Sequence, residues 1–301
     1  MNILILADRS DPHAVHLQQV IAQIGVPVYT WNTQEFPTQI QLSWQPATDR
    51  GRLILPEGKG LDFDQIHSVF WRSFTGVQVP QMNEPHQSQI AFNDSISLLR
   101  SVLQACPARW INSWQAYQFH KEKPLQLRSV QQLGIPIPAT LISNDPAEIL
   151  QFCANKRTIF KPVYGGALTQ PVTAEHLEQQ RLRLALKTAP VTIQEYIPGT
   201  NIRSYVLGEK VYSAEIQSSS VDFRADATAE LIPLTLPQPI EQGCLQIARR
   251  LRLVWTAIDW RRTPQDEYIF LEANPSPMFL YFEQQTGFPI TQELVRLLVS
   301  Q

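Results

Sequence analysis

The chain has 301 residues, 44% of them hydrophobic and 9% aromatic, which is the composition of an ordinary globular protein. Its 25 basic and 27 acidic residues give a net charge of −2 without a long run of either sign, so charge gives no case for binding nucleic acid or an anionic membrane. The three cysteines are too few and too scattered for a disulfide framework, the start MNILILAD lacks the basic segment of a signal peptide, and no apolar run reaches the ~18 residues that span a bilayer. We therefore expect a soluble, cytoplasmic protein.

Strand and helix patterns alternate through the first third of the chain. Apolar runs predict strands at residues 2–7, 26–31, 68–71 and 109–111, and helical spacing predicts helices at 13–24 and 91–103. Two further strands, 40–44 and 52–55, are expected to form a local hairpin. This alternation is typical of a small, mostly parallel sheet, so we expect an α/β domain over residues 1–111. No GxGxxG motif follows the first strand, which removes support for a dinucleotide site there.

From residue 112 onward, proline and glycine separate shorter elements. Helices are predicted at 124–133, from 146 after the cap Asp145, and at 173–187, 240–251 and 291–299. Strands are predicted at 140–142, 158–162, 191–196, 203–207 and 210–216, the last two as a hairpin. The polar stretch 217–230 is the expected mobile loop.

Two segments, 254–260 (VWTAIDW) and 268–275 (YIFLEANP), read as buried strands joined by a polar turn. If they pair about that turn, Asp259 falls opposite Glu272 on one face, and Asn274 follows on the same face. Two buried like charges are costly unless a cation lies between them, and three oxygen ligands suit Mg²⁺ and the phosphates it accompanies. The alternative is that both carboxylates are exposed and pair with Arg261 and Arg262.

Two lysines stand where they can reach phosphate oxygens. Lys161 ends a predicted strand just before a turn that contains Gly165 and Gly166, whose small size lets backbone N–H groups approach an anion. An ordinary turn explains the same residues. Lys123 precedes the helix start at Pro124, where a cation opposes the helix dipole, so its position calls for another explanation. Solvent exposure is a sufficient alternative for Lys123.

The predicted strand 191–196 ends in a sharp turn, and two arginines follow it. Backbone groups of Glu195, Tyr196 and Ile197 can face an adenine edge, although an ordinary strand end explains them as well. Arg203 and Arg224 can hold a phosphate or a carboxylate substrate, and the alternative for both is surface ion pairing.

Six segments occur in one order: NSWQAYQFHKEKPLQLRSVQQLGIPIPATLISNDP from 112, IFKPVYGG from 159, IQEYIPGTNIR from 193, VDFR from 221, AIDW from 257 and FLEANP from 270. With them, residues 112–301 resemble the ATP-grasp fold of RimK-type ligases and of graspetide (microviridin-type) peptide ligases. The resemblance implies an ATP-grasp domain over 112–301, with a small lid at about 134–191, preceded by a small parallel-sheet domain.

The resemblance also implies roles for individual residues. Those expected to bind ATP are Lys123, Lys161, Gly165, Gly166, Glu195, Tyr196, Ile197 and Asn201. Those expected to act on the transferring groups are Lys161, Arg203 and, on the acceptor side, Arg224. The expected Mg²⁺ ligands are Asp259, Glu272 and Asn274. Asn201 replaces the family's usual Asp and Phe223 replaces the usual Trp of graspetide ligases, which leaves the identity of the acceptor open.

The implied activity is an ATP-dependent ligase that joins a carboxylate to an amine or alcohol through an acyl phosphate. In the graspetide alternative, carboxylates of a ribosomal peptide are joined to Lys, Ser or Thr side chains of the same peptide, and segment 125–146 with the VDFR loop favours this one. In the RimK-type alternative, an amino acid is added to a protein or small-molecule carboxylate. A non-catalytic ATP-binding protein is a further alternative, which the intact ligand set disfavours. A homodimer is expected from the same resemblance.

Overall fold

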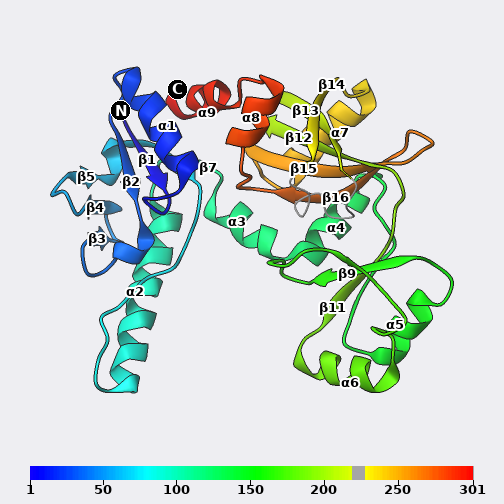
Figure 1. The fold of residues 1–301 in the computed structure, drawn as a ribbon. Helices are drawn as coiled ribbons and strands as arrows, with labels where there is room; N and C mark the ends of the chain where they lie inside the picture. The colour runs from blue at the N-terminus through cyan, green and yellow to red at the C-terminus, as the bar shows by residue number, and fades with distance from the viewer. Residues whose placement is uncertain (219–227, 301) are drawn as a thin grey trace. The chain divides into compact units, whose positions relative to one another are not determined.

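The computed structural model describes residues 1–218 and 228–300 and has a mixed α/β fold, as predicted (Figure 1). It divides into two compact units. The first takes Met1–Gln115, Met278–Glu283 and Pro289–Gln301, and the second takes Ala116–Pro277 and Gln284–Phe288. Within the described ranges, no helix combines the length and the apolar character needed to cross a membrane.

The first unit contains the predicted parallel sheet. Its four strands, all parallel, follow the order β2 (Val28–Trp31), β1 (Asn2–Leu6), β6 (Ile66–Trp71) and β7 (Arg109–Ile111). Residues 3–6 are completely buried, as expected for a parallel strand that is covered on both faces. This unit includes helices α1 (Pro12–Gln23) and α2 (Pro85–Ala105) and the short 3₁₀ turns η1 (Thr33–Glu35) and η2 (Phe63–Gln65).

Two additions complete the first unit. The predicted hairpin forms as β3 (Gln41–Gln45) and β4 (Arg50–Ile54), and a third strand, β5 (Gly60–Asp62), pairs with β4. The C-terminal helix α9 (Ile290–Val299) packs against β6, where the hydroxyl of Ser68 donates a hydrogen bond of 2.7 Å to the carbonyl oxygen of Leu298. The short helix α8 (Leu280–Thr286) precedes it.

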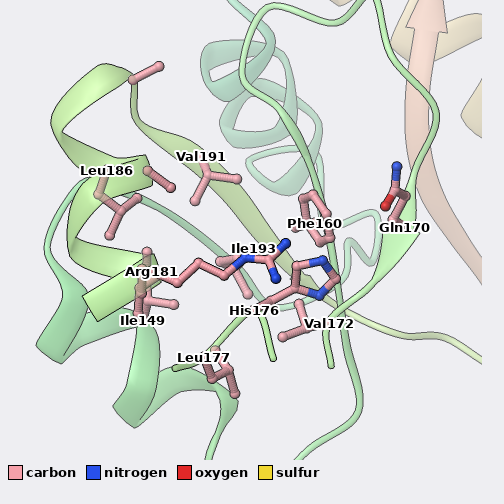
Figure 2. Close-up of a pocket in the computed structure, with 13 residues that line it drawn as sticks. Ile149, Phe160, Gln170, Val172, His176, Leu177, Arg181, Leu186, Val191 and Ile193 are labelled. Carbon is pink, nitrogen blue, oxygen red and sulfur yellow. The ribbon is translucent and has the colours of Figure 1, made fainter. Parts of the chain in front are cut away.

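The second unit holds two antiparallel sheets. The smaller one has the order β10 (Gln170–Pro171), β9 (Thr158–Pro162), β11 (Val191–Glu195) and β8 (Thr140–Ser143). Helices α5 (Pro146–Cys153) and α6 (Gln179–Thr188) form an apolar core with one face of this sheet. A cavity of about 400 Å³ lies within this core and is lined by Phe160 and Ile193 of the sheet and Leu186 of α6 (Figure 2). Lys161 and Gln194 alternate with Phe160 and Ile193 along the strands, so they belong to the opposite face.

The helix predicted at 173–187 is wrong at its start, because α6 begins only at Gln179. The carboxylate of Glu178 accepts hydrogen bonds from the N–H groups of Gln180 and Arg181 and so caps the helix there. Upstream, the ring of His176 accepts from the N–H of Thr173 (3.1 Å), which holds that stretch as a separate turn.

The larger sheet carries the predicted carboxylates. Its order is β14 (Glu230–Leu234), β13 (Lys210–Gln217), β12 (Thr200–Leu207), β15 (Trp255–Arg262) and β16 (Tyr268–Asn274). The helices α4 (Lys123–Gln131) and α7 (Gln238–Arg250) pack against it around the buried side chains of Trp260 and Phe270, and α3 (Trp114–Lys121) precedes α4. Most of the loop predicted at 217–230 lies outside the described residues. Its last residue begins β14, a strand that was not predicted and whose apolar run is interrupted by Pro233.

The turn before β12 depends on glycine. Gly199 has φ +131°, and a Cβ there would overlap the carbonyl oxygen of Arg262. Gly199→Ala should therefore lower the free energy of unfolding by at least about 2 kcal/mol, measured by urea denaturation. Gly243→Ala is the matched control, because Gly243 lies inside α7 and its added methyl would meet only ordinary contacts. The control should gain up to about 1 kcal/mol. Equal effects of the two substitutions would contradict this account of the turn.

Candidate functional site

The hairpin β15–β16 places the two predicted carboxylates opposite each other. Asp259 pairs with Glu272, and Ala257 pairs with Asn274. This register places the side chains of Asp259, Glu272 and Asn274 on one face of the sheet. A β-bulge lies directly beside this pair, because Trp260 is opposite Phe270 and Leu271 is therefore the extra residue. The predicted pairing of Asp259 with Glu272 is confirmed.

Each carboxylate is held by a cation from a different element. Arg203 lies opposite Asp259 in the neighbouring strand β12 and forms a bidentate pair with it, Nε to Oδ1 and Nη2 to Oδ2, both at 2.7 Å. Burial alone would lower the pKa of Arg203, but the charge and hydrogen bonds of Asp259 raise it above its ordinary value. The guanidinium therefore stays charged inside the sheet.

Glu272 lies among three cations. Lys123, at the start of α4, donates from Nζ to its Oε2 at 2.7 Å. Burial alone would raise the pKa of Glu272, but the charge and hydrogen bond of Lys123, with the charges of Lys161 and Arg203, lower it to about 2. The site thus combines three cationic side chains with two carboxylates, an excess that suits an anionic ligand such as a polyphosphate.

The smaller sheet and the turn at Gly165 and Gly166 contribute to the same site as Glu272. Lys161 Nζ donates to Oε1 of Gln194 on β11 at 3.1 Å, and one narrow cavity is lined by Lys161, Lys123 and Glu272. Gly165 and Gly166 both have positive φ, and a Cβ on Gly165 would lie 3.3 Å from Nζ of Lys123. The structure therefore brings both predicted lysines and the glycine turn together with Glu272.

The predicted adenine-facing segment follows β11. The N–H of Glu195 donates to Ala139 O and the N–H of Tyr196 to Arg157 O, both at 2.9 Å. The carbonyl oxygen of Ile197 accepts from Nε of Arg261, also at 2.9 Å.

Arg261 is a residue whose role sequence reasoning missed. Its Nη1 also donates to Oδ1 of the buried Asn201 at 2.7 Å, so the side chain of this predicted ATP-binding residue is engaged by a neighbour. The alternative in which Arg261 and Arg262 pair with the hairpin carboxylates is wrong, because Arg262 pairs instead with Glu215 at 2.7 Å. The sequence signal for this difference is the alternation along β15, which places Arg261 on the same face as Asp259 and Arg262 on the opposite face.

The donor set fits magnesium bound together with a nucleotide. Among residues 1–218 and 228–300, no group of three or more His, Cys, Asp or Glu side chains is placed to hold a metal. The predicted set instead contains two carboxylates and the amide oxygen of Asn274, which accepts from the N–H of Ser276 at 2.9 Å. Mg²⁺ is usually held by one or two carboxylates plus substrate phosphates, so a complete protein cage is not required. Arg224, predicted on the acceptor side, lies outside the described residues.

Family models match nearly the whole chain. Residues 2–118 match the MvdD pre-ATP grasp domain, and residues 120–298 match the RimK-like ATP-grasp domain. A probable alpha-L-glutamate ligase of Shewanella baltica is 27% identical over 221 residues, which is 68% of this chain and 65% of that protein. The chain thus spans less than two thirds of the length of the curated relatives it matches.

Solved structures extend the similarity over the full length. The macrocyclase MdnC from Microcystis aeruginosa, bound with the precursor peptide MdnA, has a TM-score of 0.87 at 26% identity, with 100% of both chains covered. The RiPP-associated ATP-grasp ligase of Chryseobacterium gregarium, in complex with ADP and a leader and core peptide, has a TM-score of 0.86 at 26% identity. The match covers 99% of this chain and 96% of that one. The ATP-grasp ligase PsnB, complexed with a variant of its minimal precursor, Mg and ADP, has a TM-score of 0.84 at 26% identity. The match covers 99% of this chain and 97% of that one.

The lowered pKa of Glu272 predicts a specific loss of stability in acid. Its carboxyl has a pKa of about 2 in the fold against an ordinary 4.5, so its contribution is complete above pH 4.5 and is lost as pH falls toward 2. The free energy of unfolding of the wild type should therefore fall toward that of Glu272→Gln as pH falls from about 4.5 to about 2, measured by urea denaturation. Glu267→Gln, in the exposed turn of the same hairpin, should keep the wild-type pH profile. A gap between wild type and Glu272→Gln that stays constant with pH would refute the assignment.

Proposed function

Because this chain belongs to the RimK-like ATP-grasp family, we propose that it is an ATP-dependent ligase that joins a carboxylate to an amine or alcohol through an acyl phosphate. The family predicted from the sequence is confirmed. The observation that carries the proposal is the cluster in which Lys123, Lys161 and Arg203 surround the Asp259–Glu272 pair. The proposed organisation is an N-terminal domain over 1–111 and an ATP-grasp domain over 112–301 with its lid at about 134–191, in a cytoplasmic protein that forms a homodimer.

The proposed reaction has two steps. A carboxylate oxygen of the substrate attacks the γ-phosphorus of ATP, ADP leaves, and an acyl phosphate forms. The amine or hydroxyl then attacks the acyl carbon, phosphate leaves, and one water is lost overall from the joined groups. No side chain of the enzyme has to form a covalent bond.

The chain's own residues contribute charge and position. Lys123, Lys161 and Arg203 neutralise the phosphoryl oxygens during transfer. Magnesium, held by Asp259, Glu272 and Asn274, supplies further charge neutralisation on the phosphates when it is bound.

The remaining contributions concern the nucleotide and water. The glycine turn at Gly165 and Gly166 lets backbone N–H groups approach the phosphates, and backbone groups of Glu195 to Ile197 face the adenine, with Asn201 beside them. The lid keeps water from the acyl phosphate, and Arg224 serves the acceptor side.

We propose a ribosomal peptide as the substrate, with its acidic side chains joined to Lys, Ser or Thr side chains of the same peptide. Support comes from the full-length similarity to MdnC, PsnB and the Chryseobacterium ligase, each of which was solved with a precursor or core peptide. The second candidate is addition of an amino acid to a protein or small-molecule carboxylate. It is favoured by the 27% identity to proteins named as probable alpha-L-glutamate ligases.

Loss of the Glu272 carboxylate should stop ATP turnover. We expect Glu272→Gln to release ADP at least about 100-fold more slowly than the wild type in a coupled assay, because a charged group at the phosphates is lost. Its far-UV circular dichroism should be unchanged. Glu267→Gln is the matched control, since Glu267 is an exposed glutamate at the turn of the same hairpin, and it should turn over normally. Normal ADP release by Glu272→Gln would contradict the proposed role of Glu272 in ATP turnover.

Mass spectrometry distinguishes the two substrate classes. Short acidic peptides encoded beside the gene are incubated with enzyme, ATP and magnesium. The proposal predicts loss of one water per bond formed, with no mass added, because donor and acceptor belong to one peptide. A gain of one amino-acid residue would establish the second candidate instead. Neither product, with no ADP released, would contradict the ligase proposal.

A further inference from the structure

Gln126 is a buried side chain that the proposed reaction does not use. It lies on α4 and is 2% exposed. Its Nε2 donates to the carbonyl oxygen of Ala273 at 2.9 Å, and its Oε1 accepts from the N–H of the same residue at 2.9 Å. Ala273 stands between Glu272 and Asn274, so both hydrogen bonds fall between two of the proposed magnesium ligands.

The two hydrogen bonds complete an open edge of the larger sheet. Among residues 1–218 and 228–300, strand β16 is the last strand of that sheet and has β15 as its one strand partner. An edge strand leaves every second residue's N–H and C=O pointing away from its partner, and such groups cost free energy when they are buried without a hydrogen bond. A primary amide presents an N–H donor and a carbonyl acceptor on the same side, as the N–H and C=O of one residue of an antiparallel strand do. Gln126 therefore takes the place of a further strand at Ala273.

The same helix contacts the next residue of the strand. Lys123 lies three positions before Gln126, so both side chains leave the same face of α4. Lys123 pairs with the carboxylate of Glu272, and Gln126 holds the backbone of Ala273. Helix α4 thus fixes two consecutive residues of β16 by two different kinds of contact, at the place where the bulge has already displaced the strand.

We propose that Gln126 is a positioning residue of the metal site, which fixes the backbone of Ala273 and through it the side chains of Glu272 and Asn274. The inference rests on the proposed function, because that function gives Glu272 and Asn274 their role toward magnesium. Groups that orient metal ligands from outside typically change metal affinity by about 10- to 100-fold when they are removed.

The test uses Gln126→Met, which keeps the shape of the side chain and removes both hydrogen bonds to Ala273, together with a longer contact of 3.5 Å between Nε2 and Nδ1 of His120. Mn²⁺ serves as a paramagnetic substitute for Mg²⁺, and its Kd in the ADP complex of the full chain is measured by electron paramagnetic resonance. We expect this Kd to rise about 10- to 100-fold. The Kd of ADP measured in EDTA should stay close to the wild-type value, because Lys123 and Lys161 remain. A wild-type Kd for Mn²⁺ overturns the proposal.

Val130→Ala separates positioning from general stability. Val130 is fully buried in the same helix, so its truncation lowers the melting temperature without removing a hydrogen bond to β16. It should leave the Kd of Mn²⁺ unchanged, and a rise equal to that of Gln126→Met overturns the proposal. If Gln126→Met does not fold, Gln126→Asn replaces it under the same criterion, since its shorter arm cannot keep both bonds. A wild-type protein that binds ADP equally with and without Mn²⁺ would show instead that the metal role itself has failed.

Discussion

The structure depends on the pairing of two carboxylates across adjacent strands. Asp259 and Glu272 are directly opposite in the hairpin β15–β16, a placement that is destabilising for like charges. Arg203 and Lys123 offset this repulsion, each at 2.7 Å from its own carboxylate. Removing Arg203 would leave the buried carboxylate of Asp259 without its bidentate partner, which costs on the order of 3–5 kcal/mol. A strand, a helix start and a hairpin are therefore held in one arrangement by charge.

This arrangement explains how the site can accept a nucleotide. The cations come from three elements, β9, β12 and the start of α4, and the glycine turn approaches the ammonium of Lys123. Phosphate oxygens can replace carboxylate oxygens as partners of the same cations, and a divalent ion can replace the cations as partner of the carboxylates. Under the proposed function, this exchange would give each charged group a new partner of opposite sign when the nucleotide and the metal bind.

Much of the site could be predicted from the sequence, because strand alternation and cation placement are local patterns. The pairing of Asp259 with Glu272 was predicted only approximately: counting outward from the turn pairs Asp259 with Leu271, and the bulge supplies the shift. Arg261 and Gln126 could not be assigned, since their partners are distant in sequence: Arg261 donates to the backbone of Ile197 and the side chain of Asn201, and Gln126 bonds to the backbone of Ala273. The late start of α6 follows from a single capping carboxylate, Glu178, that competes with a longer helical pattern.

The most direct test of the central claim is a crystal structure of the chain with magnesium and a non-hydrolysable ATP analogue. We predict that Lys123 leaves Glu272 for a phosphate oxygen, that Arg203 and Lys161 also contact the phosphates, and that the metal lies between Asp259 and Glu272. A nucleotide bound elsewhere, with the 2.7 Å contacts of Lys123 and Arg203 to their carboxylates intact, would contradict the account.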